Sequence, residues 1–186
     1  MTLEEEKALA RKAAFARRKQ AFDAGHPAQS ALLSEVLAAH RGKVLAGYMP
    51  IRTEIDPRPA MTEVAAFGPV AVPVIRAAGQ PLVFSQWNPG CTLVDGPFGA
   101  RVPEAERLLA PEVLIVPLVA FDRRGGRLGY GGGFYDRSLE GLRARGPVLA
   151  IGFAWSAQEA ENLPLEPTDQ PLDLIVTERA VIDLRP

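Results

Sequence analysis

The sequence is poor in the residues that form disulfides and zinc sites. Its 186 residues include one cysteine, Cys91, so no disulfide can form within the chain. A single thiol is also more typical of a reducing compartment than of a secreted protein. Only two histidines are present, His26 and His40, and neither lies at the spacing of a metal-ligand motif, so we do not expect a zinc site.

Long apolar runs and an excess charge of one sign are also missing. The longest apolar run, Val113 to Phe121, has nine residues, which is too short to span a bilayer. The segment Met1 to Lys7 is acidic, unlike the start of a signal peptide. A net charge of −1 gives no reason to expect a surface that binds nucleic acid or membranes by bulk charge. We therefore expect a soluble, cytoplasmic protein that binds neither.

Glycine, by contrast, is concentrated in residues 127–136, which have the sequence Arg-Leu-Gly-Tyr-Gly-Gly-Gly-Phe-Tyr-Asp. This segment follows the apolar run, which is typical of a buried strand, and precedes a short helix expected at 134–144. Glycines let backbone N–H groups approach a ligand closely, and a loop between a strand and a helix N-terminus favours anions, above all phosphate. Arg127 suits phosphate oxygens, and Asp136 suits Mg²⁺. The segment predicts a site for a nucleotide or a phosphorylated ligand.

The glycine segment matches neither of two common phosphate-binding motifs. A P-loop needs Gly-Lys-Ser/Thr at its end, and no lysine or serine follows these glycines. The dinucleotide fingerprint needs a third glycine where this chain has Phe134. A glycine-rich hairpin that binds no ligand is therefore an alternative that the glycines alone leave open.

The order of the expected elements indicates a single α/β domain. The first helix, 2–23, begins with a capping box formed by Thr2 and Glu5. Strand, helix and strand between residues 113 and 153 form a βαβ unit with a parallel pair. The other elements are expected as helices at 27–39 and 61–67 and as strands at 44–48, 71–75, 81–84 and 172–177. We predict a three-layer domain with N-terminal helices and a mostly parallel sheet covered on both faces.

Charged residues in two other segments are candidates for ligand binding. Lys7 and Arg11 are four residues apart and share one face of the first helix, either as solvated charges or as cations for a polyphosphate. Glu54 lies in the loop after strand 44–48, where ligands of open α/β sheets collect. It is either a surface acid or an acceptor for the N–H groups of a heterocycle, with Met49 packing on the face of that heterocycle.

Trp87 and Asp169 are further candidates. Trp87 follows strand 81–84 and is either a core or rim residue or a platform for a flat ligand. Asp169 lies in a proline-rich loop before the last strand. Together with Asp136 it would supply two carboxylates to Mg²⁺, an ion that keeps several waters and needs few protein ligands. Asp173, at the start of the last strand, is expected to be structural.

Taken together, these segments resemble the 5-formyltetrahydrofolate cyclo-ligase family, also called 5,10-methenyltetrahydrofolate synthetases. The resemblance extends over essentially the whole chain, and the glycine segment is its most specific motif. The motifs that carry it are Lys7-Ala-Leu-Ala-Arg11, Tyr48-Met-Pro-Ile-Arg-Thr-Glu54, Pro117-Leu-Val-Ala-Phe-Asp122, residues 127–136, Leu163-Pro164, Glu166, Asp169 and residues 172–178.

The resemblance implies a single cyclo-ligase domain over residues 1–186, with a fold similar to those of sugar-phosphate isomerases and CoA-transferases. It implies an ATP- and Mg²⁺-dependent cyclisation of 5-formyltetrahydrofolate to 5,10-methenyltetrahydrofolate, which releases ADP and phosphate. In the mechanism proposed for the family, the formyl oxygen attacks the γ-phosphate, N10 attacks the activated carbon, and phosphate leaves. This chemistry requires charge neutralisation and alignment rather than a protein nucleophile. We expect the protein to act as a monomer.

The resemblance also assigns site residues by position. Arg127 and Tyr135 would be catalytic, and Asp136 and Asp169 would hold Mg²⁺. Residues assigned to ATP are Lys7, Arg11, Arg127, Leu128, Gly129, Tyr130, Gly131, Gly132, Gly133, Phe134 and Tyr135. Residues assigned to the folate are Met49, Glu54, Trp87, Tyr130 and Phe134. Some family members have basic residues where this chain has Tyr130 and Gly132, so phosphate charge would be met by the remaining cations, the metal and backbone amides.

Two other functions remain compatible with the sequence. One is an enzyme that acts on a sugar phosphate without ATP, since the family's fold is similar to that of sugar-phosphate isomerases. The other is a protein that binds 5-formyltetrahydrofolate without converting it.

Overall fold

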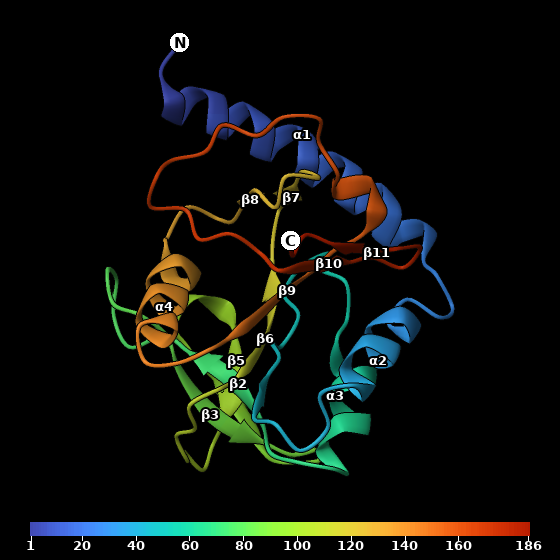
Figure 1. Ribbon diagram of the computed structural model, residues 1–186, viewed down its shortest axis with the longest axis vertical. Helices are drawn as coiled ribbons and strands as arrows, with labels where there is room; N and C mark the ends of the chain where they lie inside the picture. The colour runs from blue at the N-terminus through green and yellow to red at the C-terminus, as the bar shows by residue number, and fades with distance from the viewer.

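The computed structural model describes residues 1–186 and has a seven-stranded sheet at its centre (Figure 1). The strands lie in the order β11-β10-β9-β6-β1-β2-β3. The inner five are parallel, and only the edge strands β3 and β11 are antiparallel to their neighbours. The predicted α/β class and mostly parallel sheet are confirmed. The strands are β1 (Leu45–Ala46), β2 (Val70–Val74), β3 (Val83–Trp87), β6 (Val113–Pro117), β9 (Leu149–Phe153), β10 (Leu174–Val176) and β11 (Val181–Asp183).

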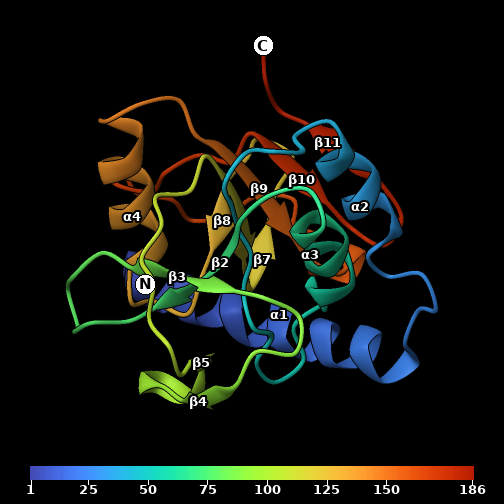
Figure 2. The ribbon, with the colours of Figure 1, turned by 90° about the horizontal axis from the view of Figure 1, so that it is seen from below.

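Helices cover both faces of this sheet, as Figure 2 shows. Helices α2 (Ala31–Ala38) and α3 (Arg58–Ala65) lie on one face, and α4 (Phe134–Arg143) lies on the other. Successive side chains along β6 point to opposite faces of the sheet and pack against the helices on each face. Val113 and Ile115 pack with α2 and α3, whereas Leu114 and Val116 pack with α4. Burial on both faces explains why this strand is continuously apolar.

Helix α1 (Leu3–Ala24) covers neither face but lies across the carboxyl ends of the strands, along the top of Figure 1. Its capping box is present, with the Glu5 N–H donating to Thr2 and the Thr2 N–H donating to Glu5. The residues that α1 buries are Lys7, Ala14 and Arg18. Its inward face is therefore largely charged. None of the four helices has the length and hydrophobicity needed to cross a bilayer.

The strand predicted at 113–121 is two strands in two sheets. Strand β6 ends at Pro117, and Ala120–Phe121 forms β7, which pairs with β8 (Arg127–Leu128) in a small antiparallel hairpin. Proline has no N–H to donate to a sheet, so it favours a strand end at this position. The hairpin carries the chain away from the central sheet, and the glycines of residues 129–133 follow directly after β8.

Other boundaries also differ from the sequence expectation. Helix α3 begins at Arg58 instead of 61, because Pro59 fits its first turn, where N–H groups have no helical acceptor. Residues 88–107, which had no assigned element, contain β4 (Leu93–Asp95), the 3₁₀ turn η1 (Pro97–Gly99) and β5 (Arg101–Pro103). Strand β11 follows β10, which was expected to be the last. Asp173 is structural, as expected, and accepts the Ala150 N–H at 2.7 Å.

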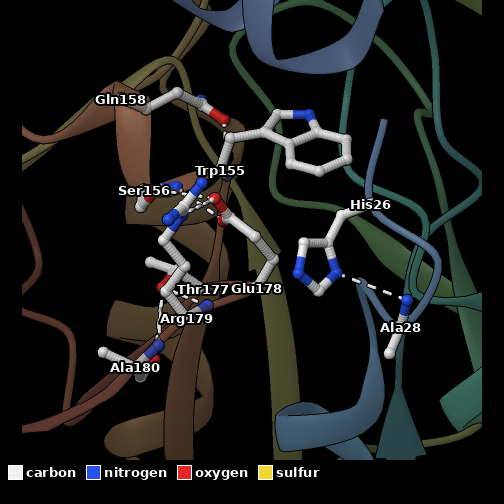
Figure 3. Close-up of polar contacts among 9 residues, drawn as sticks. All are labelled: His26, Ala28, Trp155, Ser156, Gln158, Thr177, Glu178, Arg179 and Ala180. Carbon is white, nitrogen blue, oxygen red and sulfur yellow. Dashed lines mark hydrogen bonds and ion pairs between the residues drawn. The ribbon is translucent and has the colours of Figure 1, made fainter. Parts of the chain in front are cut away.

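Polar side chains fasten the loops that follow β9 and β10 (Figure 3). The Glu178 carboxylate accepts hydrogen bonds from the N–H of Ser156 at 2.7 Å and from its hydroxyl at 2.6 Å. Gln158, in the 3₁₀ turn η2 (Ser156–Gln158), accepts the Trp155 N–H and donates to Leu118 O. The indole N–H of Trp155 donates to Thr53 O at 3.1 Å. These bonds fix η2, which supports α1, and hold the loop that contains Glu54.

The fully buried carboxylate of Asp122 organises the β7–β8 hairpin. One oxygen accepts the N–H groups of Arg124 at 2.9 Å and Gly126 at 3.1 Å. The other accepts the Leu163 N–H at 3.3 Å and the Arg124 guanidinium at 2.7 Å. Asp122 thus closes the hairpin turn and ties a distant loop to it. Because β8 leads directly into the glycine segment, the position of Arg127 depends on this carboxylate.

We expect the Asp122→Ala variant to lose on the order of 1–3 kcal/mol of unfolding free energy, because buried N–H groups lose their acceptor. Chemical denaturation followed by tryptophan fluorescence measures the change. Asp23→Ala is the matched control, since Asp23 is exposed and pairs only with Lys19 one turn away on α1. It should change stability by no more than about 0.5 kcal/mol. Equal losses in the two variants would contradict this role of Asp122.

Candidate active site

A cavity of about 810 Å³ lies at the carboxyl ends of the central parallel strands. Pro117 at the end of β6, Tyr48 after β1 and Pro73 on β2 line its base. Its walls come from α1, from the glycine segment and from the β4–β5 hairpin, which contributes Phe98. This edge is where ligands of open parallel sheets bind, and the volume is that of a small-molecule site.

All but one of the residues that were predicted to bind a ligand line this cavity. Those that do are Lys7, Arg11, Met49, Glu54, Arg127, Leu128, Gly129, Tyr130, Gly131, Gly132, Gly133, Phe134, Tyr135, Asp136 and Asp169. Trp87 is the exception. It lies at the end of β3, 6% exposed, and packs in the core cluster under α2 and α3. An indole enclosed by that core does not reach the cavity, so this placement does not support the folate contact predicted for Trp87.

The glycine segment presents a row of free backbone N–H groups. It runs from β8 into α4, and its φ angles are positive at Gly131 (103°) and Gly133 (66°), where a side chain would be strained. None of the N–H groups of residues 129–133 donates a hydrogen bond within the chain. The first turn of α4 adds N–H groups that have no helical acceptor. Such a set of donors at the start of a helix is an anion site.

Two cations lie beside this loop, the half-buried Arg11 and the buried Arg127. The Arg11 Nε donates to Gly129 O at 2.9 Å. Arg127 is 7% exposed, and its Nη2 lies 2.6 Å from Asp136 Oδ1. Burial lowers the pKa of Arg127, an effect opposed by the nearby carboxylates of Asp136 and Asp169. The Arg127 Nε and the Tyr135 hydroxyl are buried without any partner. Unpartnered buried donors that border a cavity point to a ligand.

The two carboxylates predicted to hold Mg²⁺ line the same cavity, and each has a cation beside it. The Lys7 Nζ lies 3.0 Å from Glu166 and 3.8 Å from Asp169, while Asp136 pairs with Arg127. No group of three or more His, Cys, Asp or Glu side chains is close enough to enclose a metal. Carboxylates nevertheless suit Mg²⁺, which takes few protein ligands. The donor set therefore fits the ion, and the assignment of Mg²⁺ stays a prediction.

Glu54 is buried on another side of the cavity, 6% exposed. Its Oε2 accepts the Ile51 N–H at 2.9 Å, and its Oε1 accepts the Tyr130 hydroxyl at 3.0 Å. Burial raises the pKa of Glu54, although these two hydrogen bonds oppose the shift. Burial and the nearby Glu54 carboxylate raise the pKa of Tyr130 to about 12, so its hydroxyl remains a donor at neutral pH. Tyr130 therefore joins the glycine segment to Glu54.

Sequence reasoning missed two residues, Arg18 beside the cavity and Phe98 in its lining. Arg18, 1% exposed, donates to the Tyr130 hydroxyl and to Thr53 Oγ1, both at 2.9 Å. Its spacing of seven and eleven residues from Arg11 and Lys7 places it on the same helix face and is a signal that the sequence contained. Phe98 lines the cavity, is 67% exposed and lies 5.9 Å from the Phe134 ring. No pattern in the sequence marked Phe98.

Comparisons with known proteins point to one enzyme family. A family model described as the 5-formyltetrahydrofolate cyclo-ligase family matches residues 3–178. The 5-formyltetrahydrofolate cyclo-ligase of Mycolicibacterium smegmatis is 34% identical over 155 residues, which is 77% of this chain and 78% of the relative. The Escherichia coli K12 protein of the same name is 36% identical over 150 residues, 76% of this chain and 80% of the relative.

Solved structures support the same relationship. The NMR structure of Aquifex aeolicus 5,10-methenyltetrahydrofolate synthetase is similar to this chain, with a TM-score of 0.76 and 31% identity. The match covers 97% of this chain and 93% of that one. The Mycoplasma pneumoniae synthetase, at 22% identity and a TM-score of 0.66, shows the likeness of fold alone. With a family model that spans nearly its whole length, this chain belongs to the 5-formyltetrahydrofolate cyclo-ligase family of ligases.

Proposed function

We propose that this protein catalyses the ATP-dependent cyclisation of 5-formyltetrahydrofolate to 5,10-methenyltetrahydrofolate, with release of ADP and phosphate. The contact between Tyr130 and Glu54 is the observation that carries the proposal. It brings a loop of free amides, suited to phosphate, next to a buried carboxylate, suited to an N–H-rich heterocycle. A reaction between a triphosphate and a pterin needs both kinds of site in one cavity.

The triphosphate binds to the glycine segment. Lys7, Arg11 and Arg127 neutralise its charge, and the N–H groups of Gly129 to Gly133 donate to its oxygens. The buried Arg127 Nε and Tyr135 hydroxyl supply two more donors that have no partner within the chain. Together these groups compensate for the loop cations of other family members. The positive charge comes from α1 and β8 instead of from the loop itself.

The folate binds beside Glu54. Each oxygen of this carboxylate accepts one hydrogen bond within the chain and can accept another from a pterin N–H group. Met49 lines the same part of the cavity and offers a polarisable surface for a flat ring. Tyr130 and Phe134, which also line the cavity, face the join between the two ligands.

The residues act through alignment and charge neutralisation. The formyl oxygen of the folate displaces ADP from the γ-phosphorus, and N10 then displaces phosphate from the formyl carbon. Both nucleophiles belong to the substrate, so the chain needs no nucleophilic side chain. Bound Mg²⁺, held by Asp136 and Asp169, would neutralise phosphate charge. Lys7 and Arg127 now pair with carboxylates, and turning to phosphate would free those carboxylates for the ion.

Incubation of the protein with 5-formyltetrahydrofolate, ATP and Mg²⁺ tests the proposal directly, with formation of the methenyl product followed by its absorbance. We expect product only when ATP is present, and loss of activity when the metal is removed with a chelator. Binding of the folate without product would favour the non-catalytic alternative. Isomerisation of a sugar phosphate without ATP would favour the alternative of a sugar-phosphate isomerase-like enzyme.

Variants of Lys7 and Arg11 test the nucleotide assignment. Loss of one charge-assisted contact costs about 1.5–3 kcal/mol, which is a roughly 10- to 150-fold rise in the KM for ATP. We expect this rise in Lys7→Ala and Arg11→Ala, with a much smaller change in the KM for the folate. Lys12→Ala is the matched control, because Lys12 is an exposed cation on α1 that does not line the cavity. Steady-state kinetics measures these changes. An unchanged KM for ATP in both Lys7→Ala and Arg11→Ala would contradict the assignment.

The raised pKa of Glu54 predicts a pH dependence of folate binding. As pH falls through this pKa, the carboxylate gains a proton and loses acceptor capacity, so the affinity for the folate should fall. Because burial raises the pKa, the fall should begin at a higher pH than for an exposed glutamate. Glu54→Gln should bind the folate roughly 10- to 100-fold more weakly and lack this acidic limb. Titration calorimetry across pH measures both effects, and an identical limb in the variant would exclude Glu54 as its source.

A further inference from the structure

Arg18 is a buried cation without a carboxylate partner. It is 1% exposed, and its only hydrogen bonds go to two hydroxyl groups, those of Thr53 and Tyr130. The ring centroids of Phe15 and Tyr130 lie 5.1 and 5.6 Å from its guanidinium carbon. Burial of a charge is unfavourable, and part of the compensation comes from the Glu54 carboxylate, whose pKa is lowered by the Arg18 charge against the larger effect of burial. Packing of α1 does not by itself require a guanidinium. Ala14, which is also buried on this helix, packs through an apolar side chain.

The two hydroxyl groups belong to the two loops that receive different ligands. Tyr130 is part of the glycine segment, and Thr53 directly precedes Glu54. The Tyr130 hydroxyl accepts a bond from Arg18 and donates one to Glu54, both close to 3 Å. Consecutive hydrogen bonds that run in one direction polarise and strengthen each other. Arg18 therefore links the orientation of the Tyr130 hydroxyl to that of the Glu54 carboxylate.

The backbone around Tyr130 does not fix this orientation by itself. Gly129 and Gly131 flank it, and glycines allow many backbone conformations. A triphosphate that orders these amides also orders Tyr130, and through Tyr130 it orders Glu54. The folate then binds to a Glu54 carboxylate that is already oriented. Each ligand therefore increases the affinity for the other.

We propose that Arg18 is a positioning residue that couples nucleotide binding at the glycine segment to folate binding at Glu54, through the hydroxyl of Tyr130. The inference rests on the proposed function, which assigns the two ligands to the two loops. Arg18 touches neither ligand and lies outside the lining of the cavity. Its effect is therefore expected in the interdependence of the two affinities rather than in either affinity alone.

Titration calorimetry tests this coupling with an ATP analogue whose β,γ-bridging oxygen is replaced by NH, so that no reaction occurs. In the unmodified protein, we expect a saturating amount of this analogue with Mg²⁺ to tighten the binding of 5-formyltetrahydrofolate by about 5-fold or more. In Tyr130→Phe, which removes the hydroxyl itself, this factor should fall close to 1. In Arg18→Met it should fall toward 1, because the Tyr130 hydroxyl loses the donor that orients it. The double variant should show no further loss, because both changes break the same link.

Arg17→Met is the matched control. Arg17 is the neighbouring residue on α1 and anchors the helix to Ala157 O at 2.8 Å, without lining the cavity. Its loss weakens the docking of α1 but should leave the coupling factor intact. Should Arg18→Met not fold, Tyr130→Phe decides the matter, because it removes one oxygen atom and keeps the ring.

The outcomes separate the inference from the proposed function. If both ligands bind the unmodified protein independently, or if either Arg18→Met or Tyr130→Phe retains the full factor, the coupling role of Arg18 is overturned and the proposed function stands. An equal loss of coupling in Arg17→Met would also overturn it, because the effect would then come from the docking of α1. If the unmodified protein binds neither ligand, the proposed function fails and the inference fails with it.

Discussion

Burial of charge at the carboxyl ends of the parallel strands is the constraint on which this structure depends. Lys7, Arg18, Glu54 and Arg127 are all at most 7% exposed, and a buried ionised group is tolerated only with polar partners. Lys7 on α1 pairs with Glu166. Arg18 and Glu54 both bond to the Tyr130 hydroxyl, and Arg127 pairs with Asp136. Four distant segments are therefore held around one cavity by directional polar contacts, and apolar packing alone would not set their orientation.

This arrangement divides the molecule into two regions with different physics. The central sheet is held by side chains that alternate between two apolar layers, so its geometry follows from close packing. Above the sheet, hydrogen bonds replace apolar packing. Asp122 and Glu178 join loops to one another, and the cavity residues join the loops to α1. A rigid layer below and a polar layer above suit a reaction that depends on aligning two ligands.

Backbone strain is also concentrated at the cavity. Arg52 and Phe98 are the only residues other than glycine with positive φ, at 52° and 60°, and both line the cavity. Such conformations cost roughly 1–3 kcal/mol each and persist where the surroundings impose them. Arg52 lies over the Tyr130 ring, and Phe98 lies against Phe134. Both strained residues therefore contact the aromatic side chains of the glycine segment.

Local chemistry in the sequence determined much of this protein. The capping box of α1, the βαβ unit and the glycine segment depend on neighbouring residues. Positions in predicted elements made Lys7, Arg11 and Glu54 candidates, and the family resemblance assigned them to ligands. Tertiary structure alone decided that Trp87 belongs to the core and that Arg18 reaches Tyr130. The physical reason is that burial and partner choice depend on which surfaces meet, and contacts across more than 100 residues leave no local periodicity to detect.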